Sequence, residues 1–86
     1  MKLSEEQSKL YHSHTIRNRQ EIDQSVYCHC ISCTRSYPSP IVTDFIKDGE
    51  GETALCPYCG IDAVIGDSCR LIINQAILTY LNKKWF

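Results

Sequence analysis

The chain has 86 residues, with nine lysines and arginines against ten aspartates and glutamates. The formal net charge is −1 and the pI is near 6.2, which argues against a protein that binds nucleic-acid phosphates through a basic surface. A domain of this size buries a small share of its surface, so we expect a metal ion or disulfides to stabilise it. The six cysteines supply material for either.

We predict metal binding because the sequence indicates a cytoplasmic protein. The first residues are polar, without the apolar segment of a secretory signal. No stretch approaches the roughly 20 apolar residues of a membrane span, so no membrane association is expected. Thiols are kept reduced in the cytosol, where closely spaced cysteines more often bind a metal than form a disulfide.

The N-terminal segment, residues 1–27, is predicted to form a helix and a polar connection, in which residues 15–26 are a loop or a short helix. Ser4 and Gln7 fit a capping box, in which each residue's side chain bonds to the other's backbone N–H. This pattern predicts a helix over about residues 5–14.

The middle of the chain is predicted to hold a short helix and two strands. Ser39 as N-cap and Pro40 at the first helical position favour a helix over about residues 40–47, where apolar residues recur at helical spacing. Residues 53–55 and the β-branched segment 61–65 are expected to form strands on either side of the second cysteine pair.

The C-terminal segment is expected to form an amphipathic helix. Ser68 and Asn74 are both competent N-caps, and we favour Asn74, which gives a helix over about residues 74–84. One face of this helix is apolar and is expected to pack on the core rather than form a partner-binding groove. The residues of that face are Ile77, Leu78, Leu81 and Trp85.

Two C-x-x-C motifs separated by 22 residues are the strongest functional signal. Such a turn lets both sulfurs approach one cation at about 2.3 Å, and two turns complete a tetrahedron. Four cysteine ligands leave no open coordination position, which makes the metal structural. We favour zinc over iron because nothing nearby indicates electron transfer. The prediction is one Zn²⁺ per chain, bound by Cys30, Cys33, Cys56 and Cys59.

The remaining cysteines leave one alternative open. Cys28 and Cys33 would form a wider C-x₄-C pair, with Cys28 in place of Cys30 as a ligand. His29 on a strand would point away from both neighbouring cysteines and be exposed. Cys69 is expected to be a small buried apolar residue.

Enzymatic interpretations are weaker than that of a binding module. The Cys56–Cys59 tetrapeptide is also the active-site motif of glutaredoxins, but the residues after it favour a strand over the helix that lowers the thiol pKa. A ββα-type nuclease would need a histidine after the second motif, and all three histidines precede it. Asp44, Asp48 and Asp62 lack a partner at fixed spacing and are expected to form a solvated acidic face.

Negative charge is concentrated around the second motif. Residues 37–69 contain one positive and six negative residues, a local charge of 1 − 6 = −5. Four thiolates around one Zn²⁺ would make this half more negative still, so it should repel DNA and RNA. Contact with nucleic acid would have to use basic residues outside it, namely Arg17, Arg19, Arg35, Arg70, Lys83 and Lys84.

Four segments together carry a family resemblance. They are Asn18-Arg19-Gln20-Glu21, Cys28-His29-Cys30-Ile31-Ser32-Cys33, the block from Thr53 to Asp67, and the terminal Lys-Trp-Phe. With them the chain resembles, over about residues 17–86, a family of small bacterial proteins described only as cytoplasmic proteins. The resemblance implies a C-x-C-x-x-C hook, a short helix led by proline, the Cys-Pro-x-Cys-Gly-Ile-Asp block and a C-terminal amphipathic helix. It implies a bacterial, phage or mobile-element origin and no particular activity.

The sequence thus predicts a small α+β protein: a zinc ribbon with two zinc knuckles, a short antiparallel sheet and flanking helices. The ribbon is assigned to residues 28–86. Because such ribbons chiefly present surfaces, we expect a non-enzymatic protein-binding adaptor or inhibitor with no small-molecule substrate, and with Tyr58, Trp85 and Phe86 exposed. The alternatives are a nucleic-acid-binding zinc ribbon, an immunity or anti-defence protein, and a thiol–disulfide oxidoreductase.

Overall fold

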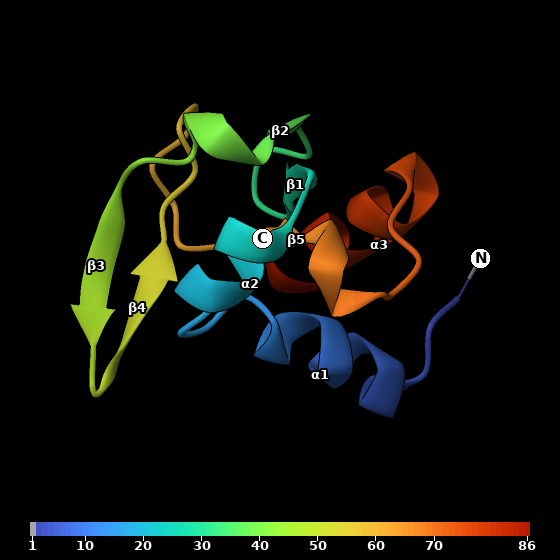
Figure 1. Cartoon of the computed structure of the whole chain (residues 1–86). Coiled ribbons are helices and arrows are strands. Elements are labelled where there is room, and N and C mark those ends of the chain that lie inside the picture. The colour runs from blue at the N-terminus through green and yellow to red at the C-terminus, as the bar shows by residue number, and fades with distance from the viewer. Residues whose placement is uncertain (1) are drawn as a thin grey trace.

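The computed structural model describes residues 2–86, which form a small α+β protein with two short antiparallel sheets (Figure 1). The helices are α1 (Glu5–Ser13), α2 (Arg19–Gln24) and α3 (Gln75–Trp85), with single 3₁₀ turns η1 (Ser39–Ile41) and η2 (Asp67–Cys69). The strands are β1 (Tyr27–Cys30), β2 (Ser36–Pro38), β3 (Phe45–Asp48), β4 (Gly51–Ala54) and β5 (Val64–Gly66). Within residues 2–86, no helix has the length and apolar character needed to cross a bilayer.

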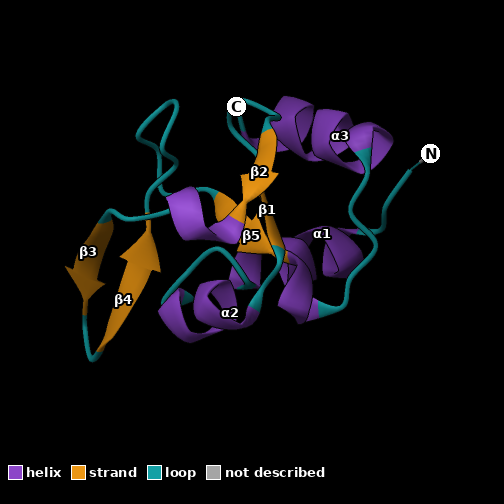
Figure 2. Ribbon diagram, turned by 45° about the horizontal axis from the view of Figure 1, so that its top comes forward, coloured by secondary structure: helices purple, strands orange, loops and turns teal. Residues whose placement is uncertain are grey.

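The core lies around a three-stranded sheet in the order β2-β1-β5. Cys28 is opposite Tyr37 on one side and Gly66 on the other, and Cys30 is opposite Val64. All three residues of β5 are buried. Figure 2 shows why: β1 and β5 lie between α3 on one side and α1 and α2 on the other.

Both long helices begin where the sequence predicts. The Ser4 hydroxyl accepts from the Gln7 N–H at 3.1 Å, and the Gln7 side chain accepts from the Ser4 N–H at 2.9 Å, which confirms the capping box. Asn74 caps α3 by accepting from the Ile77 N–H at 2.9 Å. The apolar face of α3 packs into the core as expected, with Ile77, Leu78 and Leu81 buried and Trp85 packed against them.

The helix predicted over residues 40–47 is wrong. Pro40 lies in the single turn η1, and the following residues form β3, which pairs with β4. A two-residue turn closes this hairpin, with Gly49 at φ +62° in its first position. Glycine at the first position of a two-residue turn favours the hairpin, so Gly49 closes a β-turn here.

The strand predicted over residues 61–65 begins only at Val64. Ile61 belongs to the turn before it, because its carbonyl accepts from the Cys56 N–H at 3.0 Å. Gly66 ends β5 at a close approach: a Cβ on it would lie 2.2 Å from the Ser25 hydroxyl oxygen. The strand predicted over residues 53–55 corresponds to the end of β4.

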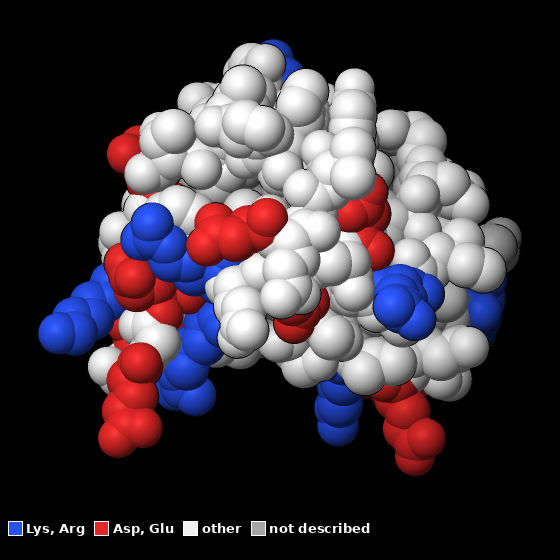
Figure 3. Space-filling model, in the orientation of Figure 1, with Lys and Arg blue, Asp and Glu red and all other residues white. Residues whose placement is uncertain are grey.

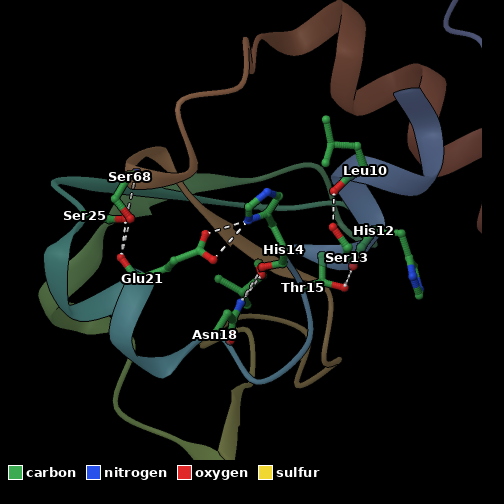
Figure 4. A network of polar contacts seen from close by, with 10 residues as sticks. Leu10, His12, Ser13, His14, Thr15, Asn18, Glu21, Ser25 and Ser68 are labelled. Atoms are coloured by element: carbon green, nitrogen blue, oxygen red, sulfur yellow. Dashed lines mark hydrogen bonds and ion pairs between the residues drawn. The ribbon is translucent and has the colours of Figure 1, made fainter. Parts of the chain in front are cut away.

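A polar network fixes α2 against η2 (Figure 4). His14 Nδ1 lies 2.8 and 3.0 Å from the two carboxylate oxygens of Glu21. The Glu21 carbonyl accepts from the hydroxyls of Ser25 and Ser68, each at 2.7 Å. Glu21 therefore bonds through its side chain and its backbone to segments before and after it.

The Asn18 side chain joins three parts of the fold and is only 2% exposed. Its amide nitrogen donates to the carbonyls of Val64 at 2.7 Å and His14 at 3.0 Å. Its amide oxygen accepts from the Ala54 N–H at 3.0 Å. One amide thus connects the end of α1 to β4 and β5.

Replacing Asn18 with Asp should destabilise the protein by about 3 kcal/mol, because a buried carboxylate would face the carbonyls of Val64 and His14 without a donor. Urea unfolding measures the loss. The control Gln20→Glu makes the same chemical change on an exposed side chain of α2 and should change stability by about 0.5 kcal/mol or less. Equal effects of the two substitutions would contradict the role given to Asn18.

Candidate metal centre

The structure brings the four predicted cysteines together. Their sulfur atoms all lie within 4.8 Å of one another. Cys30 and Cys59 are 3.6 Å apart at Sγ, and Cys33 and Cys56 are 3.7 Å apart. A regular tetrahedron with a metal–sulfur distance of about 2.3 Å has edges of about 3.8 Å. Four free thiols at this spacing form a possible site for one tetrahedral metal ion.

Two turns of the same backbone design carry these cysteines: the first cysteine turn (residues 30–35) and the second cysteine turn (residues 56–61). In each, the N–H of the first cysteine donates to the carbonyl five residues later, and the N–H four residues later donates back to the first cysteine. The bonds are Cys30 to Arg35 at 2.9 Å, Thr34 to Cys30 at 2.8 Å, Cys56 to Ile61 at 3.0 Å and Gly60 to Cys56 at 2.9 Å. The site is therefore built twice from one local pattern.

The residue after the second cysteine of each turn has a left-handed backbone. Gly60 has φ +75° and Thr34 has φ +62°. Glycine adopts this conformation without penalty, whereas a β-branched residue does so rarely. Thr34 therefore has a strained backbone at the position where Gly60 has none. The sequence did not indicate Thr34 as a site residue, although an alignment of the two motifs places it opposite Gly60.

Backbone and side-chain donors surround the sulfurs. The Cys33 N–H points at Cys30 Sγ at 3.5 Å, and the Tyr58 N–H points at Cys56 Sγ at 3.4 Å. Burial raises the pKa of Cys30 and of Cys33. Burial would also raise the pKa of Cys56, but hydrogen bonds led by the Tyr37 hydroxyl lower it to about 7. A bound cation would supply the charge that lets all four thiols ionise.

Tyr37, on β2, is a site residue that the sequence did not indicate. Its side chain is 2% exposed, and its ring lies 5.5 Å from that of Tyr58. The hydroxyl has no partner in strict hydrogen-bond geometry, yet it lies close enough to the Cys56 sulfur to affect the pKa of that thiol. Tyr37 therefore fills the core beneath the second cysteine turn, with its hydroxyl near one sulfur.

Asn82 attaches α3 to the first cysteine turn. Its amide nitrogen donates to the carbonyl of Ser32 at 2.6 Å and to that of Ile31 at 3.1 Å. The Ile31 N–H donates to the Ala63 carbonyl at 2.9 Å, just beyond the second turn. The backbone between Cys30 and Cys33 is thus held from both sides.

The four sulfurs differ in exposure. Cys30 is fully buried and Cys56 is 3% exposed. Cys33 is half-buried, and Cys59 is exposed. One corner of the site therefore faces solvent while two are covered by the core.

The other candidate residues lie outside this cluster. Cys28 is fully buried on β1, where burial raises its pKa to about 12, and Cys30 rather than Cys28 joins the group of four. His29 is half-buried rather than exposed, and its Nδ1 lies 2.7 Å from the Ser36 hydroxyl. Cys69 is half-buried against the core, less covered than expected.

Comparisons of this chain with family models, curated proteins and solved structures find no match. The family resemblance seen in the sequence stays a prediction. The interpretation of the site rests on its geometry.

Cys59→Ser should weaken zinc binding by more than about 100-fold, since the loss of a residue that only hydrogen-bonds to a ligand already costs about 10- to 100-fold. Competition with a chromophoric chelator measures the affinity. Cys69→Ser makes the same change outside the cluster and should leave the affinity within about threefold. A matched loss in both variants would rule out the assigned ligand set.

Substitutions at the two left-handed positions should change the folding stability in opposite directions. A Cβ at Gly60 would meet nothing within 4 Å, so Gly60→Ala should cost only the backbone term of about 1–2 kcal/mol. Thr34→Gly removes the same backbone cost from the folded state. It also stabilises the unfolded state by about 0.5–1 kcal/mol through added chain entropy, so the net gain in folding stability is up to ~1 kcal/mol. Thermal unfolding of the zinc-loaded variants measures both, and destabilisation by Thr34→Gly would show that the turns are not equivalent.

Proposed function

We propose that the protein is a zinc-ribbon module, a non-enzymatic protein-binding adaptor or inhibitor of the cytoplasm, in which one Zn²⁺ joins the two cysteine turns. The observation that carries the proposal is the approach of four sulfurs at tetrahedral spacing, with closest pairs at 3.6 and 3.7 Å. The ligands are Cys30, Cys33, Cys56 and Cys59.

A zinc ion held by four thiolates has no position left for water or substrate, so its contribution is to folding. The binding free energy of such sites, on the order of 10 kcal/mol, is comparable to the whole stability of a typical small domain. The module would therefore fold with its metal and present a surface rather than a reaction centre.

The pairing of the sulfurs supports a metal over a dithiol. Cys56 approaches Cys33 at 3.7 Å and Cys59 approaches Cys30 at 3.6 Å, so the sulfurs of the two turns contact one another. An oxidoreductase would instead pair Cys56 with Cys59 and place the motif at the start of a helix, which lowers the thiol pKa. Here the chain leaves Cys59 through a loop, residues 60–63, that leads into β5 and not into a helix.

The arrangement of charges supports a protein partner over nucleic acid. Arg17 lies 3.8 Å from Asp48, Arg19 lies 3.1 Å from Glu52, and Lys84 bonds to Glu5. Figure 3 shows acidic and basic side chains close together near the β3–β4 hairpin rather than a surface of one sign. Phosphate binding needs uncompensated positive charge, and these basic residues already have carboxylate neighbours.

Exposed aromatic and apolar side chains of the second cysteine turn also support a protein partner. Tyr58 is 56% exposed and Ile61 is 40% exposed. The Arg35 guanidinium lies 4.9 Å above the Tyr58 ring. Aromatic residues and arginine are enriched at the centres of protein interfaces.

Protein purified without added metal should carry one zinc per chain by native mass spectrometry, and excess chelator should abolish its near-ultraviolet circular dichroism. The reason is that metal binding and folding are coupled in a module of this kind. A folded, metal-free chain would contradict the zinc-ribbon proposal.

A separate experiment tests whether the partner is a protein or a nucleic acid. Zinc-loaded wild-type protein should capture a protein from lysate of its native host after nuclease treatment, whereas Cys59→Ser should not. Steeply salt-dependent binding to DNA or RNA, without a protein partner, would favour the nucleic-acid alternative.

A further inference from the structure

A cleft of about 400 Å³, whose lining includes none of the four clustered cysteines, lies where segments distant in the sequence meet. Its lining comes from α1 and the turn after it, the first cysteine turn, β3, the segment before β5, and the end of α3. The residues that matter for its chemistry are Ile16, Ile31, Asp48, Asp62, Trp85 and Phe86. We refer to it as the Trp85 cleft.

The Trp85 cleft has an apolar base and an aromatic wall. Ile31 is 1% exposed and belongs to the core, whereas Ile16 is 40% exposed and Phe86 is 62% exposed. Trp85 is half-buried, and its ring lies 5.2 Å from that of His12. An aliphatic chain that entered the cleft would therefore contact apolar surface along its length.

Carboxylates give the cleft its charge. Asp48 and Asp62 line it, and no lysine or arginine does. The Asp48 carboxylate accepts from the Thr53 hydroxyl at 3.2 Å. It also lies 3.8 Å from Arg17, and this ion pair is weak because the side chains are 39% and 58% exposed. Within residues 2–86, Asp62 makes no ion pair. The acidic groups expected to form a solvated face thus include two that line an apolar cleft.

We propose that the Trp85 cleft binds an arginine side chain of the partner protein, an inference that rests on the proposed protein-binding function. The methylenes of the arginine would lie on Ile16 and Ile31, and its guanidinium would face Trp85 and bond to Asp62. Arginine fits better than lysine because a planar guanidinium both stacks on aromatic rings and bonds to carboxylates through two N–H groups. The cleft volume is in the range of pockets that enclose groups of this size.

The chain itself binds an arginine in this manner elsewhere. The Arg19 guanidinium lies 4.4 Å from the Phe45 ring centroid and bonds to both carboxylate oxygens of Glu52 at 3.2 and 3.1 Å. An aromatic face and a carboxylate together hold it. The Trp85 cleft offers the same two elements, and Lys84, which lies 5.9 Å from the Trp85 ring, is already bonded to Glu5.

The test uses the zinc-loaded full chain and the peptide acetyl-Gly-Arg-Gly-amide, with the citrulline peptide of the same shape as the uncharged control. In a ¹H–¹⁵N NMR titration we expect saturable shifts at the Trp85 indole and at Ile31, with a dissociation constant on the order of 1 mM. The citrulline peptide should bind at least about tenfold more weakly, because it loses the charge-assisted bonds. Equal binding of the two peptides, or no saturable shift with either, would overturn the proposal.

Matched variants separate the cleft from the general acidic surface. Asp62→Asn should weaken binding of the arginine peptide by about tenfold. Asp44→Asn makes the same charge change at an exposed residue outside the cleft lining and should change the affinity by less than about twofold. Equal weakening by both would show non-specific attraction and overturn the site.

Failure here is distinguishable from failure of the proposed function. In one outcome, the zinc-loaded wild-type protein captures a partner, and Asp62→Asn captures the same partner equally well. The arginine site is then wrong and the adaptor function stands. If the partner is lost in Asp62→Asn and displaced from wild type by the arginine peptide, the site is supported. A chain that folds without zinc overturns the module itself.

Discussion

Four sulfur atoms within 4.8 Å of one another are the constraint from which most of this structure follows. They belong to two motifs separated by 22 residues, so the intervening chain must leave the first turn and return. It does so through β2, η1 and the β3–β4 hairpin. The first turn follows β1 and the second precedes β5, so bringing the turns together also aligns these strands in the core.

Two asparagine side chains hold the first cysteine turn and the strands next to the second one. Asn82 fixes the first turn to α3, and Asn18 fixes β4 and β5 to the segment after α1. Each amide satisfies backbone groups that a short strand leaves unpaired, which is necessary because buried unpaired groups are costly. The protein thus depends on a few side-chain-to-backbone bonds as well as on its apolar core.

Features with local causes could be predicted from the sequence, and features with distant causes could not. The capping residues Ser4 and Asn74 bond within three residues of themselves, and the cysteine motifs carry their turn geometry with them. The segment 40–47 has apolar residues at helical spacing, but its pairing with β4 and the turn at Gly49 decide its structure. Asn18 and Tyr37 act on residues 19 to 46 positions away, and no periodicity marks such contacts. The Trp85 cleft could not be predicted for the same reason, because its lining residues come from distant parts of the chain.

Because the four cysteines differ in exposure, the candidate metal centre is more accessible to solvent from one side than from the others. In a tetrahedral thiolate site, a competing ligand attacks whichever sulfur it can reach, and here that is Cys59, on the exposed side of the second turn. Cys30 and Cys56 lie under the core and hold their positions as long as the sheet is intact. A zinc ion in this site would therefore exchange through one corner, so that the speed of metal transfer follows the motion of residues 57–60 while the affinity reflects the whole fold.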